Sequence, residues 1–135
     1  MVNAPAAAFG WMAAAFAAAL LLSALVTRLQ TWWMRRHPVP DLDRVLPEAL
    51  QHETLVIYFH SPHCAHCRAL TPLIERLRAS GHPILMVDVQ QRPEVARALR
   101  VVGTPTLVRL RRARIEAVLL GAQAEAKIRR FVEKA

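Results

Sequence analysis

The hydrophobic and polar positions divide the chain into a long apolar start and a later series of short apolar segments. No Asp, Glu, Lys or Arg occurs between Ala4 and Thr27, and most of these residues are apolar. About 20 such residues are enough to cross a bilayer as a helix. Trp11 and Trp32 are 21 positions apart, and tryptophan favours the two membrane–water interfaces, so the pair could mark both edges of the hydrocarbon layer. The pattern therefore predicts one transmembrane helix with a basic and aromatic flank that ends at His37.

Two other interpretations compete with the membrane helix. A cleaved signal peptide carries positive charge before its apolar core, and no Lys or Arg precedes Arg28. Its apolar core is also shorter, at about 7–15 residues. An Ala-rich helix buried in a soluble domain is the third interpretation, because alanine is only weakly hydrophobic. The length of the apolar stretch favours the membrane helix over both.

The rest of the chain alternates between predicted strands and predicted helices. Short apolar runs bounded by Gly or Pro indicate four strands, at residues 54–59, 84–89, 106–110 and 115–120. Helical spacing and helix-starting residues indicate four helices, at residues 41–50, 64–80, 93–99 and 124–134.

This order predicts an α/β fold. Strands that alternate with helices pair in parallel through crossover helices, and the last two strands form an antiparallel hairpin. The expected architecture is a minimal four-stranded mixed sheet flanked by helices and preceded by one transmembrane helix. The predicted domains are an anchor with its flank at 1–37 and a folded domain at 38–135. The 135 residues allow one such domain and little more.

The net charge of +8 adds little to this picture. Three arginines lie beside the apolar stretch, and the remainder is still net basic. Solubility is the simplest explanation, and attraction to anionic lipid is a second. Nucleic-acid binding is not predicted, because the aromatic residues that stack on bases are scarce after Trp33.

The only two cysteines in the sequence, Cys64 and Cys67, lie at the predicted start of a helix. Residues three apart share one helical face, so the two sulfur atoms can reach disulfide distance. A helix N-terminus stabilises a thiolate through its free N–H groups and positive partial charge. We expect the more exposed Cys64 to attack and Cys67 to resolve the mixed disulfide. His66, when protonated, adds positive charge beside Cys64.

Metal binding is the alternative use of this segment. A CxxC pair is often half of a four-cysteine zinc site, which two cysteines cannot complete. Three histidines nevertheless fall close to the pair, which gives a possible ligand set of His60, His63, Cys64, His66 and Cys67. Thiolates together with imidazoles suit zinc or copper. The alternative function is therefore a membrane-tethered copper or zinc binding or transfer protein, whereas the simpler interpretation of His60 and His63 is polar lining of a redox site.

The segment Tyr58–Arg68 resembles the active-site segment of the thioredoxin family. Pro72 matches the proline that kinks the active-site helix in that family, and Val102–Leu107 matches its cis-proline loop. Gly121 matches a glycine after the last strand. The resemblance extends over nearly all of the chain after the predicted anchor, and this set of motifs is far more specific than CxxC alone.

The resemblance implies a thioredoxin-like fold and thiol–disulfide exchange with protein substrates, driven by an upstream thiol reductant or oxidant. It implies a cis peptide bond between Thr104 and Pro105, with Pro105 at the catalytic site. Gly103 and Thr104 are then expected in the loop that pairs with an extended substrate peptide. His63, which replaces a tryptophan of the family, is expected at the substrate-binding rim. No cofactor is expected.

Two further departures from the family concern proton transfer. Tyr58 stands where thioredoxins have a buried Asp that handles protons for the buried thiol, and Met86 aligns with the Lys that accompanies it. A phenol is a poor base near neutral pH. We therefore expect the proton of Cys67 to pass to water, His60 or His63, and we do not expect fast thioredoxin-like reductase activity.

Two features predict opposite sides of the membrane for the cysteines. Basic flanks usually stay in the cytoplasm, and the arginines here follow the apolar stretch. The Ala65-His66 dipeptide resembles the Pro-His pair of periplasmic oxidants, and Thr104 resembles the residue before the cis-proline of periplasmic isomerases. We place the domain on the cytoplasmic face of a single-pass membrane protein, because the flank rule concerns insertion itself. The periplasmic or extracytoplasmic face is the alternative.

Overall fold

The computed structural model describes residues 4–36, 39 and 41–135, with side chains in the first helix described for residues 11–26, 28, 29 and 32. The chain divides into two compact units, Met1–Arg36 and His37–Ala135. Each unit is considered by itself. The domain boundary predicted between residues 37 and 38 lies outside the described residues.

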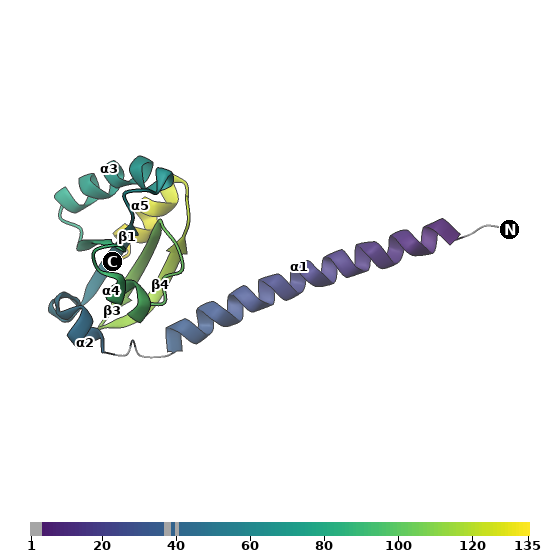
Figure 1. Cartoon of the computed structure of the whole chain (residues 1–135), viewed down its shortest axis with the longest axis horizontal. Helices are drawn as coiled ribbons and strands as arrows, with labels where there is room; N and C mark the ends of the chain where they lie inside the picture. The colour runs from purple at the N-terminus through teal and green to yellow at the C-terminus, as the bar shows by residue number, and fades with distance from the viewer. Residues whose placement is uncertain (1–3, 37–38, 40) are drawn as a thin grey trace. The chain divides into compact units, whose positions relative to one another are not determined.

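The first unit is a single helix, α1 (Ala4–Arg36), drawn in purple and blue in Figure 1. Its large apolar side chains are exposed at successive positions, including Leu20, Leu21 and Leu22. Since successive helical residues point about 100° apart, the apolar surface is not confined to one face. The prediction that this stretch is helical is confirmed, and the prediction that it crosses a membrane is not. Within the described part of the chain, no helix is both long and apolar enough to cross a membrane.

The second unit is built on a four-stranded sheet in the order β2-β1-β3-β4. The parallel pair is β1 (Thr54–His60) with β2 (Ile84–Asp88). The other two pairs are antiparallel: β3 (Thr106–Arg111) with β1, and β4 (Arg114–Leu120) with β3. The mixed sheet expected from the sequence is confirmed.

Helices cover both faces of this sheet (Figure 1). On one face lie α3 (Ala65–Ala79) and α5 (Glu125–Glu133), whose apolar residues share one core cluster with the sheet. On the other face lie α2 (Leu42–Val45), the short 3-10 helix η1 (Pro47–Gln51) and α4 (Pro93–Ala98), which share a second cluster.

The central strand β1 belongs to both clusters, because its side chains alternate between the two faces. Leu55, Ile57 and Phe59 pack with α2, η1 and α4. Val56 and Tyr58 pack with α3 and α5. All five are at most 3% exposed, which explains why the strand is a continuous apolar run rather than an alternating one.

The segment 41–50, predicted as one helix, forms two short helical pieces instead. Helix α2 ends at Val45, and Leu46 has left the helical conformation, with φ −143° and ψ 66°. The reason is Pro47, since a proline disfavours the helical conformation in the residue before it. Pro47 then begins η1, where its missing N–H is not needed.

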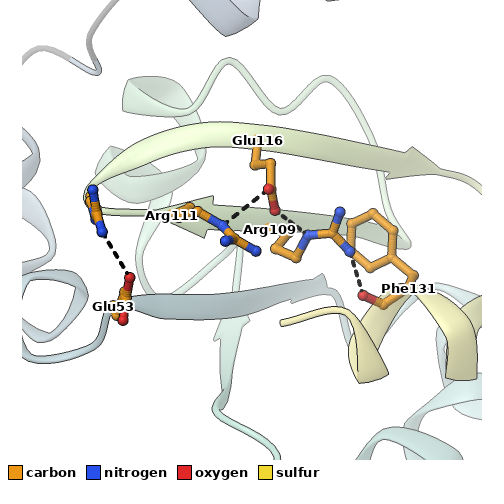
Figure 2. Close-up of polar contacts among 6 residues, drawn as sticks. Glu53, Arg109, Arg111, Glu116 and Phe131 are labelled. Atoms are coloured by element: carbon orange, nitrogen blue, oxygen red, sulfur yellow. Dashed lines mark hydrogen bonds and ion pairs between the residues drawn. The ribbon is translucent and has the colours of Figure 1, made fainter.

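Polar contacts attach α5 to the sheet, and Figure 2 shows Arg109 directed at both partners. The Arg109 Nε donates to Glu116 Oε2 at 2.6 Å across the β3–β4 pair, and its Nη1 donates to the Phe131 carbonyl oxygen at 2.7 Å. The guanidinium carbon lies 4.9 Å from the centre of the Phe131 ring. Arg111 pairs with the second carboxylate oxygen of Glu116 at 3.0 Å. These contacts join β3, β4 and α5 on the face that also carries α3.

Candidate active site

The cysteine pair lies where the parallel strand β1 gives way to α3. Cys64 is the N-cap of α3, so the helix begins one residue later than the sequence predicts. The main-chain N–H of Cys67 donates to the Cys64 Sγ at 3.2 Å. One of the free N–H groups at the start of the helix is therefore satisfied by sulfur, which is the interaction that stabilises a thiolate in this position.

Cys64 and Cys67 form a disulfide, with their Cα atoms 5.2 Å apart. The two cysteines differ in exposure, because Cys67 is only 2% exposed and Cys64 is partly exposed. Cys64 is therefore the more accessible residue of the pair.

The loop before β3 contains the cis peptide bond between Thr104 and Pro105 that the resemblance implies. Two hydrogen bonds hold this loop: Thr106 Oγ1 donates to the Gly103 carbonyl oxygen at 2.7 Å, and the Gly121 N–H donates to the Pro105 carbonyl oxygen at 2.8 Å. Gly121 has φ +71°, in the left-handed region that favours glycine. Pro105 and Thr106 are buried, whereas Gly103 is exposed and Thr104 is partly exposed.

The three histidines near the pair have different surroundings. His63 and His66 are exposed, and His60 is partly exposed with its ring stacked on Tyr58 at 5.4 Å between centres. Among the described residues, no three His, Cys, Asp or Glu side chains are grouped so that they could hold a metal ion. The alternative ligand set named above (His60, His63, Cys64, His66 and Cys67) is thus not assembled here as a metal centre.

Tyr58 lies completely buried next to Cys67. Its hydroxyl donates to the Cys67 carbonyl oxygen at 3.3 Å and lies 3.2 Å from Thr71 Oγ1, which donates to the same carbonyl at 2.8 Å. Burial raises the pKa of the Tyr58 phenol above its ordinary 10.0, and the hydrogen bond with Thr71 opposes part of that rise. Met86 stands beside Tyr58 in the register of β1 and β2. Neither side chain is a base near neutral pH.

Sequence reasoning identified the departure at Tyr58 but missed both its contact with the Cys67 carbonyl and the part played by Thr71. A signal was present, because Thr71 lies four residues after Cys67 and a threonine hydroxyl in a helix often bonds to the carbonyl four residues earlier. The contact of Tyr58 has no such local signal, since it depends on how α3 packs on β1.

A pocket with a volume of about 220 Å³ opens beside His66. Its apolar walls include Leu70 and Leu73 of α3 and Ile128 of α5, and its polar rim includes Arg76. The connection between β4 and α5 completes the lining. Among the pocket residues, His66 is the one that lies between the two cysteines in the sequence.

Comparison with known proteins agrees with this geometry. The family model described as Thioredoxin matches residues 43–134. A protein of Arabidopsis thaliana named as thioredoxin H10 is 33% identical over 94 residues, an alignment that covers 64% of this chain and 60% of the plant protein. This chain therefore spans less than two thirds of the length of that relative.

Two solved structures illustrate the shared fold. The X-ray structure of Fasciola hepatica thioredoxin has a TM-score of 0.59 and 27% identity, and the match covers 70% of this chain and 90% of that one. Mitochondrial thioredoxin 3 from Saccharomyces cerevisiae, in its oxidised form, has the same TM-score and coverage with 21% identity.

Proposed function

This chain belongs to the thioredoxin family, and from that membership we propose that it exchanges disulfides with protein substrates through Cys64 and Cys67. The thioredoxin domain and its CxxC disulfide together support thiol–disulfide oxidoreductase activity. The single observation that carries the proposal is the disulfide at the start of α3, with one accessible and one buried sulfur.

The proposed exchange needs only the two sulfurs and the client. In the reductive direction, the Cys64 thiolate attacks one sulfur of the client disulfide and releases the other as a thiolate. The Cys67 thiolate then attacks the Cys64 Sγ, which releases the second client thiolate. Two electrons pass to the client, and the Cys64–Cys67 bond forms. The reverse sequence transfers a disulfide to a reduced client.

The proton of Cys67 has no carboxylate partner at the position of Tyr58. We expect this proton to pass to water, His60 or His63 before Cys67 attacks. The raised pKa of the buried phenol supports this view, because Tyr58 keeps its own proton near neutral pH. His66 is proposed to favour the Cys64 thiolate when it is protonated, since it lies exposed at the first turn of α3.

The proposed partners are protein disulfides or dithiols together with an upstream thiol reductant or oxidant. Gly103 and Thr104 are accessible to a client peptide, and His63 is exposed before Cys64, which supports a substrate-binding rim formed by these residues. The pocket beside His66, with both polar and apolar walls, is proposed to receive a client side chain.

We further propose that α1 attaches the protein to a membrane, with the thioredoxin domain on the cytoplasmic face. The support is the sequence from Ala4 to Thr27, which contains no charged residue. Apolar side chains are exposed at successive positions of α1, and exposure of so much apolar surface to water is unfavourable. Lipid chains would remove this surface from water. The arginines that follow the stretch favour the cytoplasm by the positive-inside rule.

Trapping of client proteins tests the proposed exchange. Cys67→Ser in the full chain should accumulate mixed disulfides between Cys64 and its clients, because the resolving thiol is absent. Cys64→Ser is the matched control and should trap far fewer clients, since Cys67 is buried. Equal trapping by the two variants, or none by either in a reduced preparation, would contradict the assigned roles.

A further inference from the structure

The two hydroxyl groups beside Cys67 have a defined direction of hydrogen bonding. A carbonyl oxygen only accepts, and the proton of Thr71 Oγ1 is directed to the Cys67 carbonyl at 2.8 Å. The Tyr58 proton therefore lies between the same carbonyl, at 3.3 Å, and the Thr71 oxygen, at 3.2 Å. Tyr58 acts as a donor to the Cys67 main chain, directly and through Thr71.

This turn of α3 needs support from side chains. Pro72 lies inside the helix and has no N–H to donate to the carbonyl of Arg68, so the regular helical ladder is interrupted next to Cys67. The hydroxyls of Tyr58 and Thr71 contact the helix on the side that faces β1. They bind the carbonyl of Cys67, the residue directly before Arg68, whose carbonyl has lost its helical donor.

The orientation of Cys67 matters for the chemistry because its N–H donates to the Cys64 Sγ at 3.2 Å in the disulfide form, and the same donor is available to the Cys64 thiolate after reduction. A donor held in place at that sulfur favours the thiolate form of Cys64. A Cys67 that moves relative to Cys64 loses part of that stabilisation. The position of the Cys67 main chain therefore connects the buried sheet to the reactivity of the exposed sulfur.

We infer that the Tyr58 hydroxyl is a positioning group for the redox pair: it holds the Cys67 main chain from inside the sheet so that the Cys67 N–H stays directed at the Cys64 sulfur. This inference rests on the proposed function and assigns a neutral hydrogen-bond donor to a position where thioredoxins have an acid. The His60 ring is stacked on the Tyr58 ring, and the Tyr58 hydroxyl contacts Cys67 and Thr71.

Removal of one oxygen atom tests the inference. Tyr58→Phe in the full reduced chain keeps the ring and its packing, and the alkylation of Cys64 is followed as a function of pH. The curve should shift to higher pH, and the rate near neutral pH should fall about two- to ten-fold, the range that corresponds to one hydrogen bond. Client trapping in the Cys67→Ser background should slow to a similar extent.

A control at the other end of α3 separates positioning from stability. Ser80→Ala removes a hydroxyl that donates to the Leu77 carbonyl at 2.8 Å, far along the same helix from the cysteines. It should lower the free energy of unfolding without moving the alkylation curve. If Tyr58→Phe leaves the curve unchanged, or if Ser80→Ala moves it equally, the positioning role is wrong.

A second variant covers the case in which Tyr58→Phe fails to fold. Thr71→Val keeps Tyr58 but removes the Thr71 hydroxyl, through which Tyr58 also contacts the Cys67 carbonyl. This variant should likewise shift the alkylation curve to higher pH. No shift in Thr71→Val would contradict the inference. Failure of the proposed function is a different result, since the unmodified chain would then show no exchange with clients at all.

Discussion

The fold places the Tyr58 phenol in a buried environment that raises its pKa. Tyr58 is the only tyrosine in the sequence, so its ionisation can be followed without interference from other phenols. It is fully buried, and its proton is directed at two oxygen atoms, those of Cys67 and Thr71. Ionisation would place a negative phenolate in the core beside a carbonyl oxygen, which is unfavourable.

A pH titration of the folded protein checks this state of Tyr58. The tyrosinate absorbance should appear at higher pH than in the unfolded chain, because burial raises the pKa above 10.0. Between the unfolded and folded values the native state retains a proton that the unfolded state has lost, so the free energy of unfolding should fall as the pH rises above 10.0. Tyr58→Phe should lack this part of the fall. A native titration at or below the unfolded value would contradict the burial.

The elements β3, β4 and α5 are joined by charged groups of unequal burial. Arg109 and Arg111 both pair with Glu116, yet the Arg109 side chain is 11% exposed and the Arg111 side chain 49%. Arg109 also donates to the Phe131 carbonyl, so it ties α5 to the sheet (Figure 2). The two arginines therefore offer a comparison in which the acidic partner is the same and the burial differs.

Substitution of each arginine by methionine should separate these two situations. Arg109→Met leaves the Phe131 carbonyl without its donor and should cost about 1.5–3 kcal/mol, as expected for hydrogen bonds from a charged group. Arg111→Met removes a half-exposed pair and should cost about 0–1 kcal/mol. Chemical denaturation of both variants provides the measurement. Equal losses would mean that Arg109 does not attach α5 to the sheet.

The extent to which the sequence predicts these elements depends on how local the signal is. The apolar run in β1 and the helical spacing in α3 are local, and both elements appear close to the predicted limits. Pro47 is also a local signal, and it divides the segment 41–50 that the helical pattern predicts as one helix. The contact between Tyr58 and Cys67 joins a strand to a helix, and only their packing reveals it.

At the site itself, the motifs predicted more than the periodicity did. The cysteine pair follows from its spacing, and the cis bond before Pro105 follows from resemblance alone, since nothing in the apolar pattern distinguishes it from a trans bond. No sequence pattern predicts the pocket beside His66, because its walls come from two helices, α3 and α5, that are far apart in the sequence. The role of His66 stays a prediction.

For the whole molecule, the thiol chemistry belongs to the second unit. Every residue assigned to the site lies after residue 37, and both core clusters consist of residues from that unit. Val39 is 9% exposed within one of these clusters, so the folded domain begins before Asp41. The redox pair is therefore expected to work in the same way whatever covers the apolar surface of α1.

The side of the membrane on which Cys64 lies determines what kind of redox protein this is, and a membrane-impermeant maleimide on intact, reduced cells measures it. The arginines after the apolar stretch predict labelling only after permeabilisation, with a reductive role where the glutathione pool keeps thiols reduced. Cys64→Ser in the same assay shows how much signal belongs to that sulfur, because Cys67 is buried. Labelling of Cys64 in intact cells would overturn the cytoplasmic assignment and indicate an oxidant or isomerase outside the cytoplasm. Recovery of the full chain in the soluble fraction after cell lysis would contradict the membrane attachment itself.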